Sequence, residues 1–250
     1  MITHEEIAAL SAQFEAKPPS EIIQWAVDEF APEIAMSTSF QTQSMPLLHM
    51  VARILPNIKI FFLDTGYHFW DTLIFREQVQ QEWNLNVVDL YRDSRWDHFA
   101  RQNVRSLPLR DPNLCCYIYK VQPMQKALSG LKAWVSGIRR DQTSNRAHAQ
   151  ILELQDDGLL KVNPLLNWTK RDVQTYIVDH QLPVHPLYER GYRSIGCAPC
   201  TVAVGMDDND RAGRWAGRGK TECGLHTDMF KHKELAEVKD QFVLQPEDAK

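Results

Sequence analysis

Short apolar runs alternate with longer stretches of helical periodicity over the first 140 residues of the chain. The apolar runs at 33–37, 58–63, 86–91 and 133–138 predict buried strands. The stretches 20–32, 45–55, 67–83, 96–102 and 117–128 space their apolar residues as helices do, and Ser20 is expected to cap the first of them. Strands separated by helices predict an α/β fold: a Rossmann-like, mostly parallel sheet with right-handed crossovers.

The remaining sequence predicts smaller elements. Residues 150–162 alternate weakly around Asp157-Gly158, as in a hairpin at a sheet edge. Thr169 is expected to cap a helix that ends before Pro183, and loops and short turns should follow from residue 187. Residues 205–220 contain four glycines and too little apolar content to pack, so we expect a mobile linker there and a polar helix at 231–250. The prediction is therefore a nucleotide-binding α/β domain over 1–204 and a mobile C-terminal segment over 205–250.

Composition narrows the classes of protein. Hydrophobic residues make up 44% of the 250 residues, yet no apolar run approaches the roughly 20 residues that a membrane span needs. A formal net charge of −4 gives no reason to expect nucleic-acid binding. The N-terminal residues lack the features of a signal peptide, so we expect a cytoplasmic protein whose cysteines are ligands or catalysts rather than disulfides. A homo-oligomer is compatible with the sequence.

Three polar segments begin where predicted strands end, at residues 37–44, 64–66 and 137–146. In a parallel sheet, ligands bind beyond the carboxyl ends of the strands. The first segment also leads into a helix, whose N-terminus favours anions. The third holds Arg139, Arg140 and Arg146, and guanidinium forks match the geometry of phosphate or sulfate, although a solvated loop would look the same.

The five cysteines divide into four and one. Cys115-Cys116 and Cys197-x-x-Cys200 together supply the four thiolates of a zinc site or an iron–sulfur cluster. Adjacent cysteines constrain tetrahedral zinc ligation badly, whereas a cubane cluster spreads its ligands over four iron atoms. The pattern therefore favours a [4Fe-4S] cluster, with zinc and a redox disulfide as the alternatives.

The fifth cysteine, Cys223, lies in a segment rich in cations, with Lys220 three residues before it and His226 three residues after it. Nearby cations stabilise a thiolate, so Cys223 is a candidate nucleophile on a glycine-rich tether. The alternative is an exposed surface thiol. Lys120 follows the paired cysteines closely enough to feel both a cluster and a bound anion.

These motifs together resemble one family, the assimilatory sulfonucleotide reductases, and specifically the iron–sulfur adenylyl-sulfate (APS) reductases. The resemblance runs from about residue 37 to residue 228. Its motifs are Leu63-Asp64-Thr65-Gly66-Tyr67, Cys115-Cys116, 137–142, Gly196-Cys197-Ala198-Pro199-Cys200 and Glu222-Cys223-Gly224-Leu225-His226. It implies the adenine nucleotide alpha hydrolase-like fold of the pyrophosphate-loop type. The chain departs from the family pattern at Gln41, because the family often has glycine directly after the Ser-Phe pair.

The resemblance also assigns roles to residues. It implies that Cys115, Cys116, Cys197 and Cys200 hold a [4Fe-4S] cluster, that Cys223 is the nucleophile with His226 beside it, and that Lys120 links cluster and substrate. The substrate-binding residues expected from the loops and the resemblance are Ser39, Thr42, Gln43, Leu63, Asp64, Thr65, Gly137, Arg139, Arg146, Arg211 and Arg214.

The implied reaction is the reduction of APS to sulfite and AMP through a thiosulfonate on Cys223, with thioredoxin or glutaredoxin as the reductant, in sulfate assimilation and cysteine biosynthesis. The nearest alternative is the same reaction on the 3′-phosphorylated substrate, PAPS, which would need a further basic contact. A cluster-bearing tRNA thiolase would need a Ser-Gly-Gly-x-Asp-Ser loop and a basic face, which this sequence lacks. The last alternative, a zinc-binding interaction module, would leave Cys223 without a role.

Overall fold

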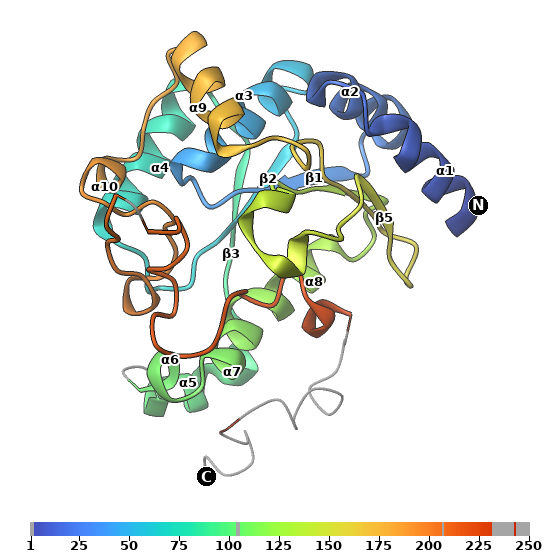
Figure 1. The fold of residues 1–250 in the computed structure, drawn as a ribbon. Helices are drawn as coiled ribbons and strands as arrows, with labels where there is room; N and C mark the ends of the chain where they lie inside the picture. Colours follow the sequence, from blue (N-terminus) through green and yellow to red (C-terminus); the bar gives the residue numbers. More distant parts are fainter. Residues whose placement is uncertain (1–2, 104–105, 207, 232–242, 244–250) are drawn as a thin grey trace. The chain divides into compact units, whose positions relative to one another are not determined.

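A computed structural model of the chain describes residues 3–103, 106–206, 208–231 and 243 (Figure 1). The chain forms two compact units. Unit 1 contains Met1–Phe62, Trp70–Val88 and Gly130–Glu189, and unit 2 contains Leu63–Phe69, Asp89–Ser129 and Arg190–Lys250. The helix predicted over 231–250 lies, except at 231 and 243, outside the described residues.

A six-stranded sheet has the order β3-β2-β1-β4-β6-β5. Its strands are β1 (Ile34–Ser37), β2 (Lys59–Leu63), β3 (Val87–Leu90), β4 (Ala133–Val135), β5 (Leu152–Leu154) and β6 (Leu160–Val162). β1 pairs in parallel with β2 and with β4, and β4 pairs in parallel with β6. β5 is antiparallel to β6, which confirms the predicted edge hairpin. The α/β prediction is therefore confirmed, and the apolar runs form strands because β1 and β4 are buried on both faces.

The helices of unit 1 are α1 (His4–Phe14), α2 (Pro19–Phe30), α3 (Met45–Ile54), α4 (Trp70–Glu82), α9 (Lys170–Asp179) and α10 (Pro186–Glu189). α3 contacts both α2 and α9 (Figure 1). Thr169 caps α9 as predicted, with a reciprocal capping box to Asp172. The predicted cap at Ser20 is wrong: α2 already begins at Pro19, because proline at the first helical position has its φ angle set for a helix.

The core of unit 1 lies where α2 and α3 meet the central strands. Ile23 of α2, Leu48 of α3 and Met36 of β1 are all fully buried and belong to one apolar cluster. The helical spacing of such residues, read from the sequence, predicted this packing because residues three and four apart share one face of a helix.

Unit 2 is built from short helices: η2 (Ser94–Trp96), α5 (Asp97–Asn103), α6 (Leu107–Arg110), α7 (Pro112–Cys116), η3 (Tyr117–Val121), α8 (Gln122–Leu128), η6 (Ala198–Cys200) and η7 (Asp228–Phe230). The expected loop around Cys115 and Cys116 is wrong, since both residues end α7. The expected regular helix over 117–128 is also wrong in its first part, because η3 is a π-helical turn. π-turns add a residue to one turn and are frequent at functional sites.

Within the described part of the chain, no helix has both the length and the apolar content needed to cross a membrane.

Candidate functional site

In unit 1, two polar loops leave the carboxyl ends of neighbouring strands. β1 pairs with β2 on one side and with β4 on the other, so the strand order reverses between β1 and β4. The loops 38–44 and 136–146 begin at this switch point, which is where open α/β sheets bind ligands. Gly137 lies near the start of the second loop, and a Cβ atom there would meet Cδ2 of Leu47 in α3 at 3.4 Å.

The loop after β1 is shaped by Phe40. Its φ angle of 52° lies in the left-handed region, and its side chain is fully buried against Phe62, with ring centroids 5.8 Å apart. Gln41 has an ordinary φ of −75°, so this loop does not need the glycine that the family often has there. The hydroxyl oxygens of Ser39 and Ser44 lie 3.4 Å apart across the loop.

Thr42 begins the short 3₁₀ helix η1 (Thr42–Ser44) and is only 3% exposed. Its hydroxyl oxygen accepts a hydrogen bond from the backbone N–H of His185 at 3.2 Å. That Thr42 binds substrate stays a prediction. In the structure that side chain faces the interior and anchors the loop.

Hydrogen bonds join the two loops. Arg139, 2% exposed, donates from Nη1 to Oε1 of Gln43 at 2.9 Å, and Gln142 donates to the same oxygen at 3.2 Å. The other side of the Arg139 guanidinium donates from Nε to Asp141 at 3.0 Å. Gln43 and Arg139 are thus brought together, as expected for one site, and they fix the second loop through η4 (Arg140–Gln142).

Two of the three arginines in the second loop are paired with carboxylates. Arg139 pairs with Asp141, and Arg140 pairs with Glu15 at 2.7 Å. The hydrogen bond from Arg140 is the main reason that the pKa of Glu15 is lowered. Arg146, at the end of η5 (Ser144–Arg146), is 7% exposed and donates to Gln142. The positive charge of this loop is therefore largely offset by neighbouring carboxylates.

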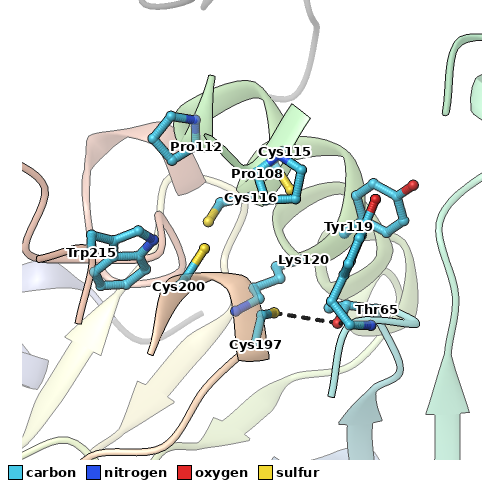
Figure 2. A pocket seen from close by; sticks show the side chains of 11 residues that line it. Thr65, Pro108, Pro112, Cys115, Cys116, Tyr119, Lys120, Cys197, Cys200 and Trp215 are labelled. Atoms are coloured by element: carbon cyan, nitrogen blue, oxygen red, sulfur yellow. Dashed lines mark hydrogen bonds between the residues drawn. The ribbon is translucent and has the colours of Figure 1, made fainter. Parts of the chain in front are cut away.

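Unit 2 contains a cavity that brings together four of the five cysteines (Figure 2). Each of these thiols is at most 8% exposed. The cavity is lined by Thr65, Tyr67, Pro108, Pro112, Cys115, Cys116, Tyr119, Lys120, Cys197, Cys200 and Trp215.

Local structure explains how α7 and η3 present their side chains to this cavity. Asp111 caps α7 by accepting a hydrogen bond from the N–H of Leu114 at 2.9 Å, and Pro112 occupies the first helical position. The helix ends at the paired cysteines after five residues. The π-turn that follows then carries Lys120, so that Cys116 and Lys120 line the same cavity.

The turn after β2 holds the other pair of cysteines. The Thr65 hydroxyl lies 3.3 Å from Sγ of Cys197 (Figure 2). The carbonyl oxygen of Tyr67 accepts a hydrogen bond from the N–H of Ala198 at 2.7 Å. Asp64 accepts from the N–H of Gly66 at 3.0 Å, and the carbonyl oxygen of Leu63 lies 2.8 Å from Nε2 of His68. These contacts place Leu63, Asp64 and Thr65 in a turn that supports the cysteine cavity.

The charges in the cavity are unequal. Burial raises the pKa of Cys115, of Cys200 and of Cys116, the last to about 11. Burial alone would lower the pKa of Lys120, but electrostatic interaction with the side chains of Cys197, Cys116 and Cys223 outweighs it and raises that pKa. Lys120 is therefore a cation held among sulfur atoms.

Trp215 anchors the segment that follows the second cysteine pair. It is 2% exposed and packs in one cluster with Cys116, Cys197 and Cys200. The Arg214 guanidinium lies 4.4 Å from the centre of its indole ring, and Nζ of Lys220 lies 5.6 Å from it. The expectation that residues 205–220 have too little apolar content to pack is wrong at this residue.

Two of the arginines of this segment, Arg211 and Arg214, have partners in unit 2. Arg211 donates to the carbonyl oxygen of Thr221 at 2.7 Å and pairs with Glu222, which is 4% exposed, at 3.5 Å. Arg214 lies 3.5 Å from the Ser194 hydroxyl, and its guanidinium passes so close to Gly196 that a side chain there would collide with it. A glycine before Cys197 thus makes room for Arg214 next to the cysteine cavity.

Cys223 packs against the group formed by Cys116, Cys197, Cys200 and Trp215, and it is half-buried. The next residue, Gly224, has a φ of +94°, and a Cβ atom there would approach Sδ of Met229 at 2.8 Å and Cγ2 of Val121 at 3.0 Å. Only glycine therefore lets the backbone pass this close to the π-turn. His226, expected beside the nucleophile, is half-buried in the same turn.

All five cysteines are thiols in the structure. Among the described residues, no group of three or more His, Cys, Asp or Glu side chains is arranged to hold a metal ion. The donor chemistry of the cavity is nevertheless clear: its lining contains four sulfur atoms and neither a carboxylate nor an imidazole. That set fits the all-thiolate ligation of an iron–sulfur cluster, and of zinc as well.

Sequence reasoning missed Trp215, Tyr119 and His185. Trp215 carried a signal, because it is an isolated aromatic residue among glycines and charges. Tyr119 sits next to Lys120 but reads as one position of an apolar helical face. His185 lies between prolines, and nothing local to it indicates that it is fully buried.

Comparisons with known proteins identify the relatives of this chain. The family model for the phosphoadenosine phosphosulfate reductase domain matches residues 33–203. Relatives named adenosine 5′-phosphosulfate reductase come from Salinibacter ruber, with 39% identity over 88% of each chain, and from Bacillus mycoides, with 40% identity over 89% of this chain and 96% of the relative.

Solved structures show the same fold. A phosphoadenylyl-sulfate reductase from Candida auris, in a phosphate complex, matches with a TM-score of 0.70 and 26% identity over 81% of this chain and 98% of that chain. An FMN adenylyltransferase from Candida glabrata matches at 17% identity and a TM-score of 0.55, over 77% of this chain and 64% of that one, which shows the fold alone. The resemblance inferred from the motifs is confirmed, and the chain belongs to the phosphoadenosine phosphosulfate reductase family.

Proposed function

We propose that this protein reduces adenylyl sulfate to sulfite and AMP, as an oxidoreductase acting on a sulfur group in sulfate assimilation and cysteine biosynthesis. Its relatives at about 39% identity carry the name of that activity. The observation that carries the proposal is the cysteine cavity of unit 2, where four buried thiols and Lys120 lie together and the fifth thiol packs against them.

In this proposal Cys115, Cys116, Cys197 and Cys200 hold a [4Fe-4S] cluster. When bound, the cluster supplies a fixed charged group beside Lys120 and need not change its oxidation state. Support comes from the four sulfur donors and from the adjacent position of Cys115 and Cys116, which suits a cubane better than a single tetrahedral ion. Thr65 contacts Sγ of Cys197, and Trp215 packs with Cys116, Cys197 and Cys200.

The proposed reaction begins at Cys223. Its thiolate attacks the sulfur of the sulfonate group, a sulfur–sulfur bond forms, and the bond from that sulfur to the phosphate oxygen breaks with its electrons leaving on AMP. The product on the enzyme is a thiosulfonate. Both reactants are anions, so the positive charges of Lys120 and Arg214 reduce their repulsion, and Arg211 contributes less because it pairs with Glu222. His226 is proposed to lie beside the nucleophile.

Sulfite is then released by an external dithiol, for which we propose thioredoxin or glutaredoxin in the cytoplasm. One thiolate of the dithiol attacks Sγ of Cys223, sulfite leaves with the electrons of the broken sulfur–sulfur bond, and a mixed disulfide forms. The second thiol of the reductant closes its own disulfide and returns Cys223 as a thiol. We propose that residues 208–230 move to expose Cys223 for this step.

The nucleotide is assigned to the switch-point loops of unit 1, with Ser39, Gln43, Arg139, Arg146 and the amides of η1 as its expected contacts. Arg139 and Arg140 already pair with carboxylates, so this loop offers little spare charge for a 3′-phosphate. We therefore favour APS over PAPS. Comparing kcat/KM for the two substrates tests this, and a higher value for PAPS would reverse it.

The direct test uses protein purified without oxygen. We expect about four iron and four sulfide per chain, and sulfite release from APS that depends on thioredoxin. Protein that contains zinc and no iron, or that releases no sulfite from either nucleotide, would refute the proposal.

A further inference from the structure

His185 joins three segments of unit 1 from the interior of the fold. The residue is fully buried, and its ring packs against Phe75 with centroids 5.1 Å apart. It lies just before α10, in the stretch that follows α9. A buried imidazole is costly unless its polar atoms are satisfied, so its hydrogen bonds indicate what it holds.

The two ring nitrogens have different partners. Nδ1 accepts a hydrogen bond from the backbone N–H of Leu187 at 3.2 Å, which requires Nδ1 to carry no proton. The proton of the neutral ring is then on Nε2, which donates to the Thr72 hydroxyl oxygen at 3.0 Å. Burial lowers the pKa of His185 to about 4, and Asp71 opposes this in part. The ring is therefore neutral near pH 7 and connects the start of α10 to the first turn of α4.

The backbone of His185 makes the third connection. Its N–H donates to the Thr42 hydroxyl, and Thr42 opens the 3₁₀ turn of the loop after β1. The next residue, Gln43, is held by Arg139. This loop is thus fixed at Thr42 by His185 and at Gln43 by Arg139 from the loop after β4.

We propose that His185 is a positioning residue that sets the loop after β1 in the conformation that binds the nucleotide. The inference rests on the proposed function, since it assumes that this loop binds the AMP part of the substrate. Loop amides bind an anion well only when they are already oriented toward it. Fixing the imidazole between Thr72 and Leu187 fixes the backbone N–H that anchors Thr42, and hence the amides of η1.

The test measures AMP binding to the full-length holoprotein by titration calorimetry. Thr72→Val removes the acceptor for Nε2 and should raise the Kd for AMP about three- to tenfold; His185→Phe removes both ring hydrogen bonds and should raise it about tenfold or more. The KM for APS should rise in parallel while kcat at saturating APS stays within about twofold, since no residue of the cysteine cavity is changed. His185→Gln, which places an amide donor near the position of Nε2, should recover most of the affinity.

Tyr176→Phe is the matched control. It removes the hydrogen bond between Tyr176 and Nδ1 of His49, which is also 3.0 Å long and also in unit 1. It should lower the Tm about as much as Thr72→Val does and leave the Kd for AMP unchanged. If His185→Phe does not fold, the Kd of Thr72→Val for AMP tests the inference by itself.

Two results would overturn the inference. In the first, Thr72→Val and the folded His185 variants bind AMP with a Kd within twofold of the wild type. In the second, Tyr176→Phe weakens AMP binding as much as Thr72→Val and the His185 variants do. In both cases the wild-type protein would still bind AMP, and the proposed function would stand. A wild-type protein that binds no AMP would remove the proposed nucleotide site, and the inference with it.

Discussion

Replacing Trp215 by alanine should destabilise unit 2 and release the segment that carries Cys223. The indole is 2% exposed and packs against three of the cavity thiols. Truncating such a side chain typically costs about 3–5 kcal/mol, because burial is lost and a cavity remains. The cations of Arg214 and Lys220 over the ring add about 0.5–2 kcal/mol each, so we expect the free energy of unfolding to fall by at least about 3 kcal/mol.

Urea denaturation followed by circular dichroism, on protein purified without oxygen, measures this loss. Trp215→Phe keeps an aromatic ring and should lose less than half as much as the alanine variant. The matched control is Trp70→Ala, since Trp70 is 77% exposed and its removal should change stability by no more than about 0.5 kcal/mol.

Trypsin provides a second readout. Arg218 donates to the carbonyl oxygen of Pro108 at 2.9 Å, and Lys220 donates to Asn113, so both cleavage sites are held against α6 and α7. Trp215→Ala should therefore speed cleavage after Arg211, Arg214, Arg218 and Lys220. A loss below about 1 kcal/mol together with an unchanged cleavage rate would refute the anchoring role of Trp215.

Three further predictions concern the segment 211–220, His185 and the four cysteines of the cavity. Substrate, or AMP with sulfite, should slow trypsin cleavage in residues 211–220, and equal rates with and without ligand would remove the proposed movement. As the pH falls from 6.5 to about 4, His185 should lower the free energy of unfolding by about 3 kcal/mol, because it takes up a proton in the unfolded chain but not in the folded one. If the free energy of unfolding of His185→Phe falls as steeply with pH as that of the wild type, this prediction is contradicted. Serine substitution of any one of the four proposed ligands, Cys115, Cys116, Cys197 and Cys200, should cause loss of iron and of the cluster absorbance. A variant that keeps its full iron content would show that the substituted cysteine is not a ligand.

The periodic part of the fold could be predicted from the sequence because its cause is local. β1, β2 and β4 are apolar since both faces of the sheet are covered, and α3 repeats its apolar residues every three or four positions. The polar segments after β1, β2 and β4 followed from the apolar runs, because each segment begins where a run ends, whereas the switch point between β1 and β4 is seen only in the observed strand order. The Cys115-Cys116 and Cys197-x-x-Cys200 motifs also pointed correctly to one cavity, since their chemistry requires them to meet.

The rest depends on contacts between residues distant in sequence. Residues 117–128 have helical periodicity, and only packing around the cavity decides that the first turn is a π-turn. Nothing in the sequence around Thr42 indicates that its hydroxyl oxygen accepts a hydrogen bond from His185, 143 residues away. Trp215 sits in a stretch that composition marks as unable to pack, and it is buried because a set of thiols from other segments covers it.

The central claim is that four cysteines hold the cluster while Cys223 performs the chemistry. Its most direct test is Cys223→Ser, purified without oxygen and assayed for iron, AMP binding and sulfite release from APS with thioredoxin. The account predicts wild-type iron content and wild-type AMP affinity with no sulfite release, because only this thiol lies outside the ligand set. Loss of iron, or sulfite release at the wild-type rate, would contradict it.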